Sequence, residues 1–280
     1  MKCVLPLFFL FIVFCSCESD QRIPSNKETI ALGHGGNGFI GFFGTEAPNS
    51  IQSIKSAISH EDTKGIEVDC QLLADGTLLL YHDQFLESQT HCEGEVAYAY
   101  WEEIKNCKYD LIIESEENVL FNLDGLLRLV QNRGLTISLD IKIFPDGRNR
   151  DSLFVEFDRA IRKSLKENDF DGTLFIESNS HKLLTYLKGT RLPARLYFYA
   201  NEFENGHKIA LEKGFDGLSI SNKNITSSQV SSAQKNGLLV MIFGAKNERS
   251  NLEVLAKGPD YLQTDDLKHI QTLIYSNDVE

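Results

Sequence analysis

Positive charge is scarce in this sequence of 280 residues. Lys and Arg together number 28 against 40 Asp and Glu, which gives a formal net charge of −12 at pH 7. Such a chain does not attract a nucleic-acid backbone or an anionic membrane surface, so we expect no nucleic-acid partner. No feature of the sequence indicates a protein partner either. An anionic small molecule would need a local positive centre, which a bound divalent cation can supply.

Cysteine is scarce too, and its spacing excludes a zinc site. Three of the six cysteines lie within the first 17 residues, and the remaining three, Cys70, Cys92 and Cys107, are not clustered. A disulfide between Cys92 and Cys107 would suit an exported protein and would leave Cys70 alone on the outer face of its strand. The glycine-rich run at 33–44 lacks both the spacing of a dinucleotide fingerprint and the Gly-Lys-Ser/Thr of a P-loop.

The N-terminal apolar stretch is too short to span a bilayer. It covers residues 4–14, whereas a transmembrane helix needs about 20 residues. Its length and the basic start before it are typical of a signal-peptide core. Ser16-Cys17 then resembles a bacterial lipoprotein cleavage site, with an ordinary secreted protein as the alternative. We expect a signal peptide at 1–17 and a polar tether at 18–28. The mature chain is then expected to be an exported bacterial lipoprotein, anchored to a membrane by its lipid and located in the periplasm or on the cell surface.

From residue 29 onward, short apolar strands alternate with amphipathic helices. The expected strands are 29–33, 65–71, 77–81, 136–142, 173–177, 195–199, 217–221, 238–243 and 260–263. The expected helices are 50–59, 123–132, 151–167, 180–188, 204–213, 226–236, 248–257 and 266–276. This alternation predicts a parallel sheet. About eight strand–helix units in about 250 residues are the usual content of a closed (β/α)₈ TIM barrel. We therefore expect one α/β domain over 29–280, with an open doubly wound sheet as the alternative.

Two acidic side chains share one face of the strand at 65–71. Residues two apart in an extended chain point the same way, so Glu67 and Asp69 lie side by side. Their carboxylates repel each other unless a cation or a shared proton relieves the repulsion. A turn at 75–76 and a short apolar strand then bring His82 to the end of the same hairpin. The plain alternative is two exposed strand acids and a surface histidine.

These residues belong to a series of motifs that resembles the glycerophosphodiester phosphodiesterase family. The family pattern is His-Arg-Gly, Pro-Glu-Asn-Thr, Glu-x-Asp, Lys/Ala-Asp-Gly and His-Asp. The corresponding segments here are His34-Gly35-Gly36, Ala47-Pro48-Asn49-Ser50, Glu67-Val68-Asp69, Ala74-Asp75-Gly76 and His82-Asp83. The resemblance covers roughly residues 30–270 and is most specific in the last three motifs.

The family also carries an insertion after the second strand, which corresponds here to about residues 84–117. Residues 100–105 are similar to its short helix. We expect Tyr98, Tyr100 and Trp101 to form the small core of this insertion rather than a ligand-binding cluster.

The resemblance implies a divalent cation, Mg²⁺ or Ca²⁺, bound by Glu67, Asp69 and Asp140. Oxygen ligands suit both ions, and the active site of such barrels lies at the carboxyl ends of the strands. Asp140 stands where the family has a glutamate. The alternative for Asp140 is an internal ion pair with Lys142, which shares its face of the strand.

The implied reaction is hydrolysis of a small glycerophosphodiester to an alcohol and a glycerol phosphate. His34 and His82 are implied as the acid/base pair, because imidazole titrates near neutral pH. The motifs do not distinguish which of the two is the base. The implied substrate-binding residues are Lys142, Asn49 and Gly35.

Two departures from the family pattern bear on activity. Gly35 replaces an arginine, which removes a bidentate contact to phosphate, and Pro48 replaces a glutamate. A non-catalytic ligand-binding lipoprotein is therefore one alternative function. The other is a phosphatidylinositol phospholipase C-like enzyme, which is also a barrel with two histidines. The histidines that match no motif are expected at the surface: His60, His91, His181, His207 and His269.

Overall fold

The computed structural model describes residues 29–38, 45–112 and 115–275. The predicted signal peptide at 1–17 and the tether at 18–28 lie outside this part of the chain. Within it, no helix has both the length and the apolar character that a membrane crossing requires.

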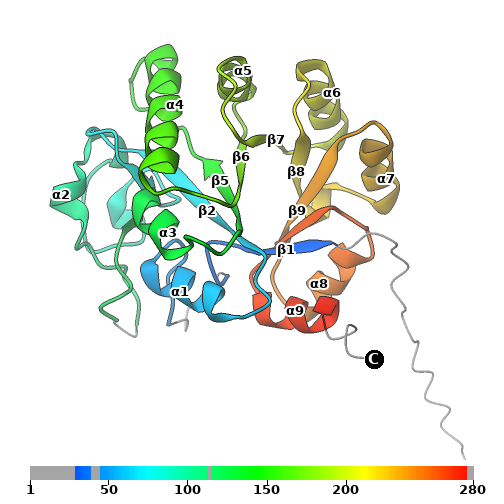
Figure 1. Cartoon of the computed structure of the whole chain (residues 1–280), viewed down its shortest axis with the longest axis horizontal. Helices are drawn as coiled ribbons and strands as arrows, with labels where there is room; N and C mark the ends of the chain where they lie inside the picture. The colour runs from blue at the N-terminus through cyan, green and yellow to red at the C-terminus, as the bar shows by residue number, and fades with distance from the viewer. Residues whose placement is uncertain (1–28, 39–44, 113–114, 276–280) are drawn as a thin grey trace, which may run out of the picture.

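Eight parallel strands form a closed barrel with helices packed around it (Figure 1). In order around the barrel, the strands are β1 (Ile30–Gly33), β2 (Gly65–Leu72), β5 (Thr136–Ile141), β6 (Thr173–Ser178), β7 (Arg195–Ala200), β8 (Gly217–Ser221), β9 (Leu239–Ala245) and β10 (Tyr261–Thr264). Strand β1 closes the sheet because Ile30 pairs with Tyr261 of β10 and Gly33 pairs with Ile66 of β2. The predicted (β/α)₈ barrel is confirmed, and the open sheet is excluded.

A short antiparallel hairpin extends from β2 as predicted. Strand β3 (Leu78–Leu80) pairs with β2, and β4 (Phe121–Asn122) pairs with β3. At the turn, an Asp75 carboxylate oxygen accepts a hydrogen bond from the Thr77 N–H at 2.9 Å. Gly76 has φ 82°, a left-handed conformation that glycine adopts without strain. The hairpin brings the chain back to the barrel mouth.

Helices cover the outside of the barrel and follow the strands in sequence. The helices around the barrel are α1 (Ile51–Ser59), α3 (Leu123–Leu129), α4 (Arg150–Glu167), α5 (His181–Gly189), α6 (Phe203–Lys213), α7 (Ser227–Lys235), α8 (Glu248–Leu255) and α9 (Leu267–Tyr275). The helix predicted at 123–132 ends earlier, at Leu129. Helix α1 begins where predicted, because the Ser50 hydroxyl accepts a hydrogen bond from the Ser53 N–H at 3.1 Å and satisfies a free N–H of its first turn.

Apolar side chains fill two layers of the barrel. Between strands and helices, Leu139 and Phe157 are among the fully buried side chains. Inside the barrel, Phe175 packs against Tyr197 and Tyr261, with ring centroids 5.0 and 4.9 Å away. Burying one such side chain stabilises the fold by about 1.5–3 kcal/mol. The interior layer closes the barrel beneath a polar mouth.

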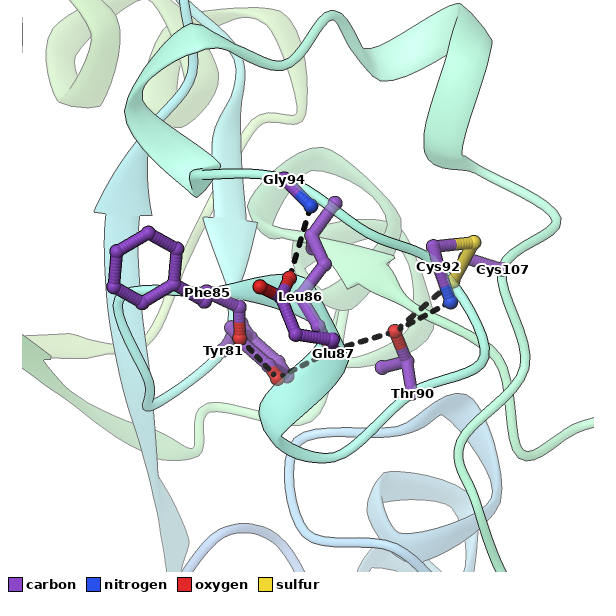
Figure 2. Close-up of a disulfide and its surroundings, with 8 residues drawn as sticks. All are labelled: Tyr81, Phe85, Leu86, Glu87, Thr90, Cys92, Gly94 and Cys107. Carbon is purple, nitrogen blue, oxygen red and sulfur yellow. Dashed lines mark hydrogen bonds between the residues drawn. A yellow bond between two sulfur atoms is a disulfide. The ribbon is translucent and has the colours of Figure 1, made fainter.

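The insertion between β3 and β4 is held by its own disulfide, between Cys92 and Cys107 (Figure 2). The Tyr81 hydroxyl lies 3.0 Å from the backbone carbonyl oxygens of both Phe85 and Leu86, and its one proton, shared between them, fixes the start of the insertion. Cys70 is free and buried on the outer face of β2, as the spacing of the cysteines predicted. The insertion contains the helical turns η1 (Leu86–Ser88), η2 (Val96–Tyr98) and α2 (Trp101–Ile104). Outside the insertion, another helical turn, η3 (Asn222–Asn224), follows β8.

The aromatic core predicted for the insertion is only partly correct. Trp101 packs partly against the core of the insertion, but Tyr98 and Tyr100 are 58% and 52% exposed. The core is formed instead by aliphatic side chains around two buried tyrosines, Tyr81 and Tyr109.

Candidate active site

Six of the eight predicted site residues line one cavity of about 230 Å³ at the carboxyl ends of the strands. They are His34, Glu67, Asp69, His82, Asp140 and Lys142. The register of the parallel strands brings the acids together, because Asp69 of β2 pairs with Asp140 of β5. None of the other histidines is buried, as expected. The strand-end positions of the predicted residues thus converge on one site.

Three carboxylates form a compact acidic cluster in this cavity. One oxygen from each of Glu67, Asp69 and Asp140 lies within 4.8 Å of the other two. Burial and the charge of Asp69 raise the pKa of Glu67 well above its usual range, and burial also raises the pKa of Asp140. Negative charge is therefore incompletely balanced by the protein. These oxygen ligands fit a hard divalent cation such as Mg²⁺ or Ca²⁺.

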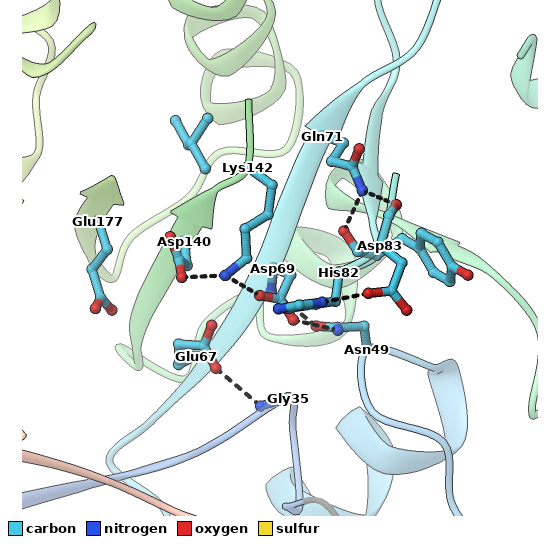
Figure 3. A network of polar contacts seen from close by, with 12 residues as sticks. Gly35, Asn49, Glu67, Asp69, Gln71, His82, Asp83, Asp140, Lys142 and Glu177 are labelled. Atoms are coloured by element: carbon cyan, nitrogen blue, oxygen red, sulfur yellow. Dashed lines mark hydrogen bonds and ion pairs between the residues drawn. The ribbon is translucent and has the colours of Figure 1, made fainter. Parts of the chain in front are cut away.

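Lys142 lies between two of these carboxylates (Figure 3). Its ammonium nitrogen is 2.6 Å from an Asp140 oxygen and 3.0 Å from an Asp69 oxygen. Burial raises the pKa of Asp69, but the charges of Lys142 and the two histidines, with the hydrogen bond from Asn49, together outweigh burial and lower that pKa. The internal ion pair considered for Asp140 is present, and it coexists with the acidic cluster.

His34 is held by a carboxylate from the last strand–helix connection. Its Nδ1 donates to Asp265 at 2.7 Å, and its Nε2 lies 3.8 Å from Glu67. Burial alone would lower the pKa of His34, but the Asp265 hydrogen bond and the Glu67 charge raise it to about 9. The imidazole therefore carries two protons near neutral pH.

His82 faces the acidic cluster from the end of the β2–β3 hairpin (Figure 3). Its Nδ1 donates to Asp83 at 2.8 Å, and Gln89 donates to the other Asp83 oxygen at 2.6 Å. Gln71 fixes the backbone on both sides by donating to the carbonyls of Tyr81 and Asp83 at 2.8 Å each. The side chain of His82 is 46% exposed, so water and a ligand can reach it.

Asn49 supports Asp69 rather than lining the cavity. Its amide nitrogen donates to the Asp69 carboxylate at 2.8 Å, and its amide oxygen accepts from the Asp69 N–H at 2.9 Å. Asn49 adopts φ 65°, a left-handed conformation that asparagine tolerates better than most residues. Both polar ends of its side chain are engaged, so the structure gives Asn49 a positioning role. A substrate contact by Asn49 stays a prediction.

The N–H groups of residues 35–37, in the loop after β1, are bonded within the protein. The Gly35 N–H donates to the Glu67 carboxylate at 3.1 Å, and the Gly36 N–H donates to the Glu67 backbone carbonyl at 3.2 Å. The Asn37 N–H donates to the Ser53 hydroxyl at 2.9 Å. These bonds do not fit a phosphate-binding role for Gly35 and its neighbours, because their donors already hold the acidic cluster and α1.

Five residues of the site matched none of the motifs. Asp265 holds His34, and the other four line the cavity: Glu177, Tyr199, Phe243 and Gln263. Each of these four lies two residues after an interior side chain, in the pairs Phe175–Glu177, Tyr197–Tyr199, Met241–Phe243 and Tyr261–Gln263. The two-residue alternation of strands was the signal that could have identified them.

Glu177 is the most buried of these additional residues, at 1% exposure. One of its oxygens accepts hydrogen bonds from the Ser138 hydroxyl and the Gln263 amide, both at 2.6 Å. Burial and the charge of Asp140 raise the pKa of Glu177 to about 7. The site therefore contains a fourth carboxylate, held apart from the acidic cluster by its own hydrogen bonds.

The chain is a closed (β/α)₈ barrel with three clustered carboxylates and two histidines at the carboxyl ends of its strands, which is where the active sites of such barrels lie. Residues 41–269 match the glycerophosphoryl diester phosphodiesterase family, so the chain belongs to that family. This membership makes it a phosphoric diester hydrolase by class and confirms the resemblance seen in the motifs.

Individual relatives agree with the family match. A glycerophosphodiester phosphodiesterase of Caldanaerobacter subterraneus subsp. tengcongensis is 26% identical over 232 residues, which cover 81% of this chain and 91% of that protein. An Oleispira antarctica phosphodiesterase, solved with sn-glycerol-3-phosphate as its product, has a TM-score of 0.76 at 20% identity, over 88% of this chain and 97% of that one. The Thermotoga maritima glycerophosphodiester phosphodiesterase has a TM-score of 0.67 at 17% identity, and the match covers 89% of this chain and 100% of that one.

Proposed function

We propose that this chain is a divalent-cation-dependent glycerophosphodiester phosphodiesterase that releases an alcohol and a glycerol phosphate. The observation that carries the proposal is the acidic cluster of Glu67, Asp69 and Asp140 lying between His34 and His82 in one cavity. The family match and the named activity of the relatives support the same reaction.

Glu67, Asp69 and Asp140 would hold the cation. When bound, the cation supplies positive charge against the phosphate as the reaction adds negative charge to it. Lys142 adds a second positive charge at the edge of the same cluster. These charges take the place of the arginine that Gly35 replaces.

His34 and His82 would move the protons. His34 keeps a proton on Nε2 near neutral pH because of its partner Asp265, so we assign it as the donor to the leaving alcohol oxygen. His82 is open to solvent and oriented by Asp83, so we assign it as the base that takes a proton from the attacking water, whose oxygen ends on the glycerol phosphate. Asp265 and Asp83 act by positioning the two rings.

Turnover measurements on a panel of glycerophosphodiesters would test this function. Activity should require Mg²⁺ or Ca²⁺, disappear with a chelator and return when the ion is restored. His34→Ala and His82→Ala should each lower kcat by roughly 10²–10⁴-fold, the range for general acid–base catalysis. His60→Ala is the matched control, because His60 follows α1 at the opposite end of the barrel.

Two outcomes would favour the alternative functions. Calorimetric binding of glycerophosphodiesters without turnover would indicate a ligand-binding barrel. Cleavage of phosphatidylinositol in vesicles, with no cleavage of the water-soluble diesters, would indicate a phospholipase C-like enzyme.

We also propose that the chain is exported and anchored by a lipid on Cys17. The short apolar segment before Ser16-Cys17 and the polar residues 18–28 support this localisation. The disulfide in the insertion is consistent with an oxidising compartment.

A further inference from the structure

A second cavity of about 280 Å³ adjoins the active-site cavity at the ends of β5, β6 and β7. The two cavities share Asp140, Lys142 and Tyr199 as wall residues. A phosphate held beside the acidic cluster could therefore extend one of its two ester groups directly into the second cavity.

The wall of this second cavity offers neutral hydrogen-bonding groups. Asn179 follows β6, immediately before the α5 cap residue Ser180, and Asn201 follows β7. Among the described residues, none hydrogen-bonds the side-chain amides of Asn179 and Asn201 or the hydroxyl of Tyr199, and Asn224 bonds only the backbone carbonyl of Asn201. Burial raises the pKa of Tyr199, so its hydroxyl stays neutral at physiological pH. Ile143 and Phe144 contribute an apolar part of the wall.

The same wall is poorly suited to a cationic group. Among the described residues that line it, Asp140 is the one acid, and it is already paired with Lys142 at 2.6 Å. An aromatic cage for a quaternary ammonium needs free ring faces. One face of Tyr199 is stacked on Phe243, with ring centroids 5.1 Å apart. Only the other face of Tyr199 and the ring of Phe144 are then left in this wall to contact a quaternary ammonium.

From this arrangement we infer that the second cavity binds a neutral, polyhydroxylated head group, such as inositol, esterified to the phosphate. Amide and phenol groups can each both donate and accept hydrogen bonds, which matches a ring of hydroxyls. Ile143 and Phe144 can cover the carbon face of such a ring. The inference rests on the proposed phosphodiesterase function and adds the substrate class to it.

Selectivity between two matched diesters tests the inference. Glycerophosphoinositol and glycerophosphocholine share the glycerol and the phosphate and differ only in the head group. We expect kcat/KM to be at least tenfold higher for glycerophosphoinositol. The double variant Asn179→Ala/Asn201→Ala should raise KM for this diester about tenfold and leave KM for glycerophosphocholine within twofold. Asn205→Ala is the control, since Asn205 is an exposed asparagine on α6 outside both cavities.

Three results would overturn the inference. One is a preference for glycerophosphocholine. Another is an equal loss on both diesters in the double variant, which would place the shared glycerol in the second cavity. The third is no effect of the double variant on either diester. If no diester is cleaved, the proposed function fails, but calorimetric binding of both diesters to the wild type and the double variant still decides the head-group selectivity.

Discussion

At the scale of single residues, the active site is organised around an excess of buried negative charge. Lys142 neutralises part of that excess from within the chain, through ion pairs with Asp69 and Asp140. An ammonium in this place can turn to the phosphate once a divalent cation takes over the carboxylates. The same lysine would thereby stabilise the cation-free site and contribute to catalysis.

Replacing this lysine should therefore impair turnover strongly. We expect Lys142→Met to lower kcat/KM for glycerophosphodiesters by about 10²-fold, which is the effect of removing one preorganised charge-stabilising group. Lys182→Met, on the exposed side of α5, is the control and should retain full activity. The measurement is steady-state kinetics at saturating cation. An unchanged kcat/KM in Lys142→Met would assign the phosphate contact elsewhere.

Restoring the family arginine at position 35 should not increase the activity of this chain. Gly35 has φ 61°, and a side chain in that region costs roughly 1–2 kcal/mol. Its N–H and carbonyl are also bonded, to Glu67 and to the Asn49 N–H. Gly35→Arg should lower the free energy of unfolding by about that amount and should not raise kcat/KM. A large gain in kcat/KM would show that the position still serves phosphate binding.

The pair of His34 and Asp265 predicts a pH-dependent stability. The folded pKa of about 9 lies above the ordinary value of 6.5, so this pair stabilises the fold fully below pH 6.5 and loses its contribution as pH rises toward 9. Asp265→Asn should lower the His34 pKa and flatten this pH dependence, with each pKa unit worth about 1.4 kcal/mol. Urea unfolding of cation-free protein at several pH values, with NMR titration of His34, checks the effect. The same slope in wild type and Asp265→Asn would contradict it.

At the scale of elements, the insertion after β3 depends on its disulfide more than the barrel does. The bond closes a loop with a sequence separation of 15 residues, for which chain entropy predicts about 3 kcal/mol of stabilisation. In the double variant Cys92→Ser/Cys107→Ser, the insertion should therefore open at a lower temperature or denaturant concentration than the one at which the barrel unfolds. Hydrogen exchange of residues 84–117 measures this local opening. Reductant should reproduce the effect in the wild type and do nothing further in the double variant.

The elements also show which parts of the site a sequence can predict. Residues within one strand or hairpin, such as Glu67, Asp69 and His82, follow from the two-residue alternation and from the family motifs. Asp265 could not be found in this way, because it lies 231 residues from His34 and reaches it only when β10 pairs with β1. The direction of the loop N–H groups depends on positive φ angles at glycines, which residue identities permit but do not specify.

At the scale of the whole molecule, cation binding should stabilise the fold. A ligand that binds only the folded state adds about 2.7 kcal/mol at a hundredfold excess over its dissociation constant. For a chain of this size, that gain corresponds to roughly 5–10 °C in Tm. Glu67→Gln should lose most of this shift and bind the cation at least tenfold more weakly by calorimetry. Glu177→Gln, a buried acid outside the cluster, should retain both effects. Equal weak binding by wild type and Glu67→Gln would argue against the site.

The last prediction concerns how the molecule is held in the cell. The described domain has no membrane-spanning helix, and the chain carries a net charge of −12, which gives no attraction to anionic lipids. We propose that membrane association depends on a lipid covalently bound to Cys17, with residues 18–28 as the tether. We expect the mature N-terminus to be a lipid-modified Cys17 by mass spectrometry, and the protein to be recovered with membranes. Cys17→Ala should shift it to the soluble exported fraction without changing kcat, because the proposed active-site residues all lie in the described barrel. An unmodified N-terminus at another residue would instead identify an ordinary secreted enzyme.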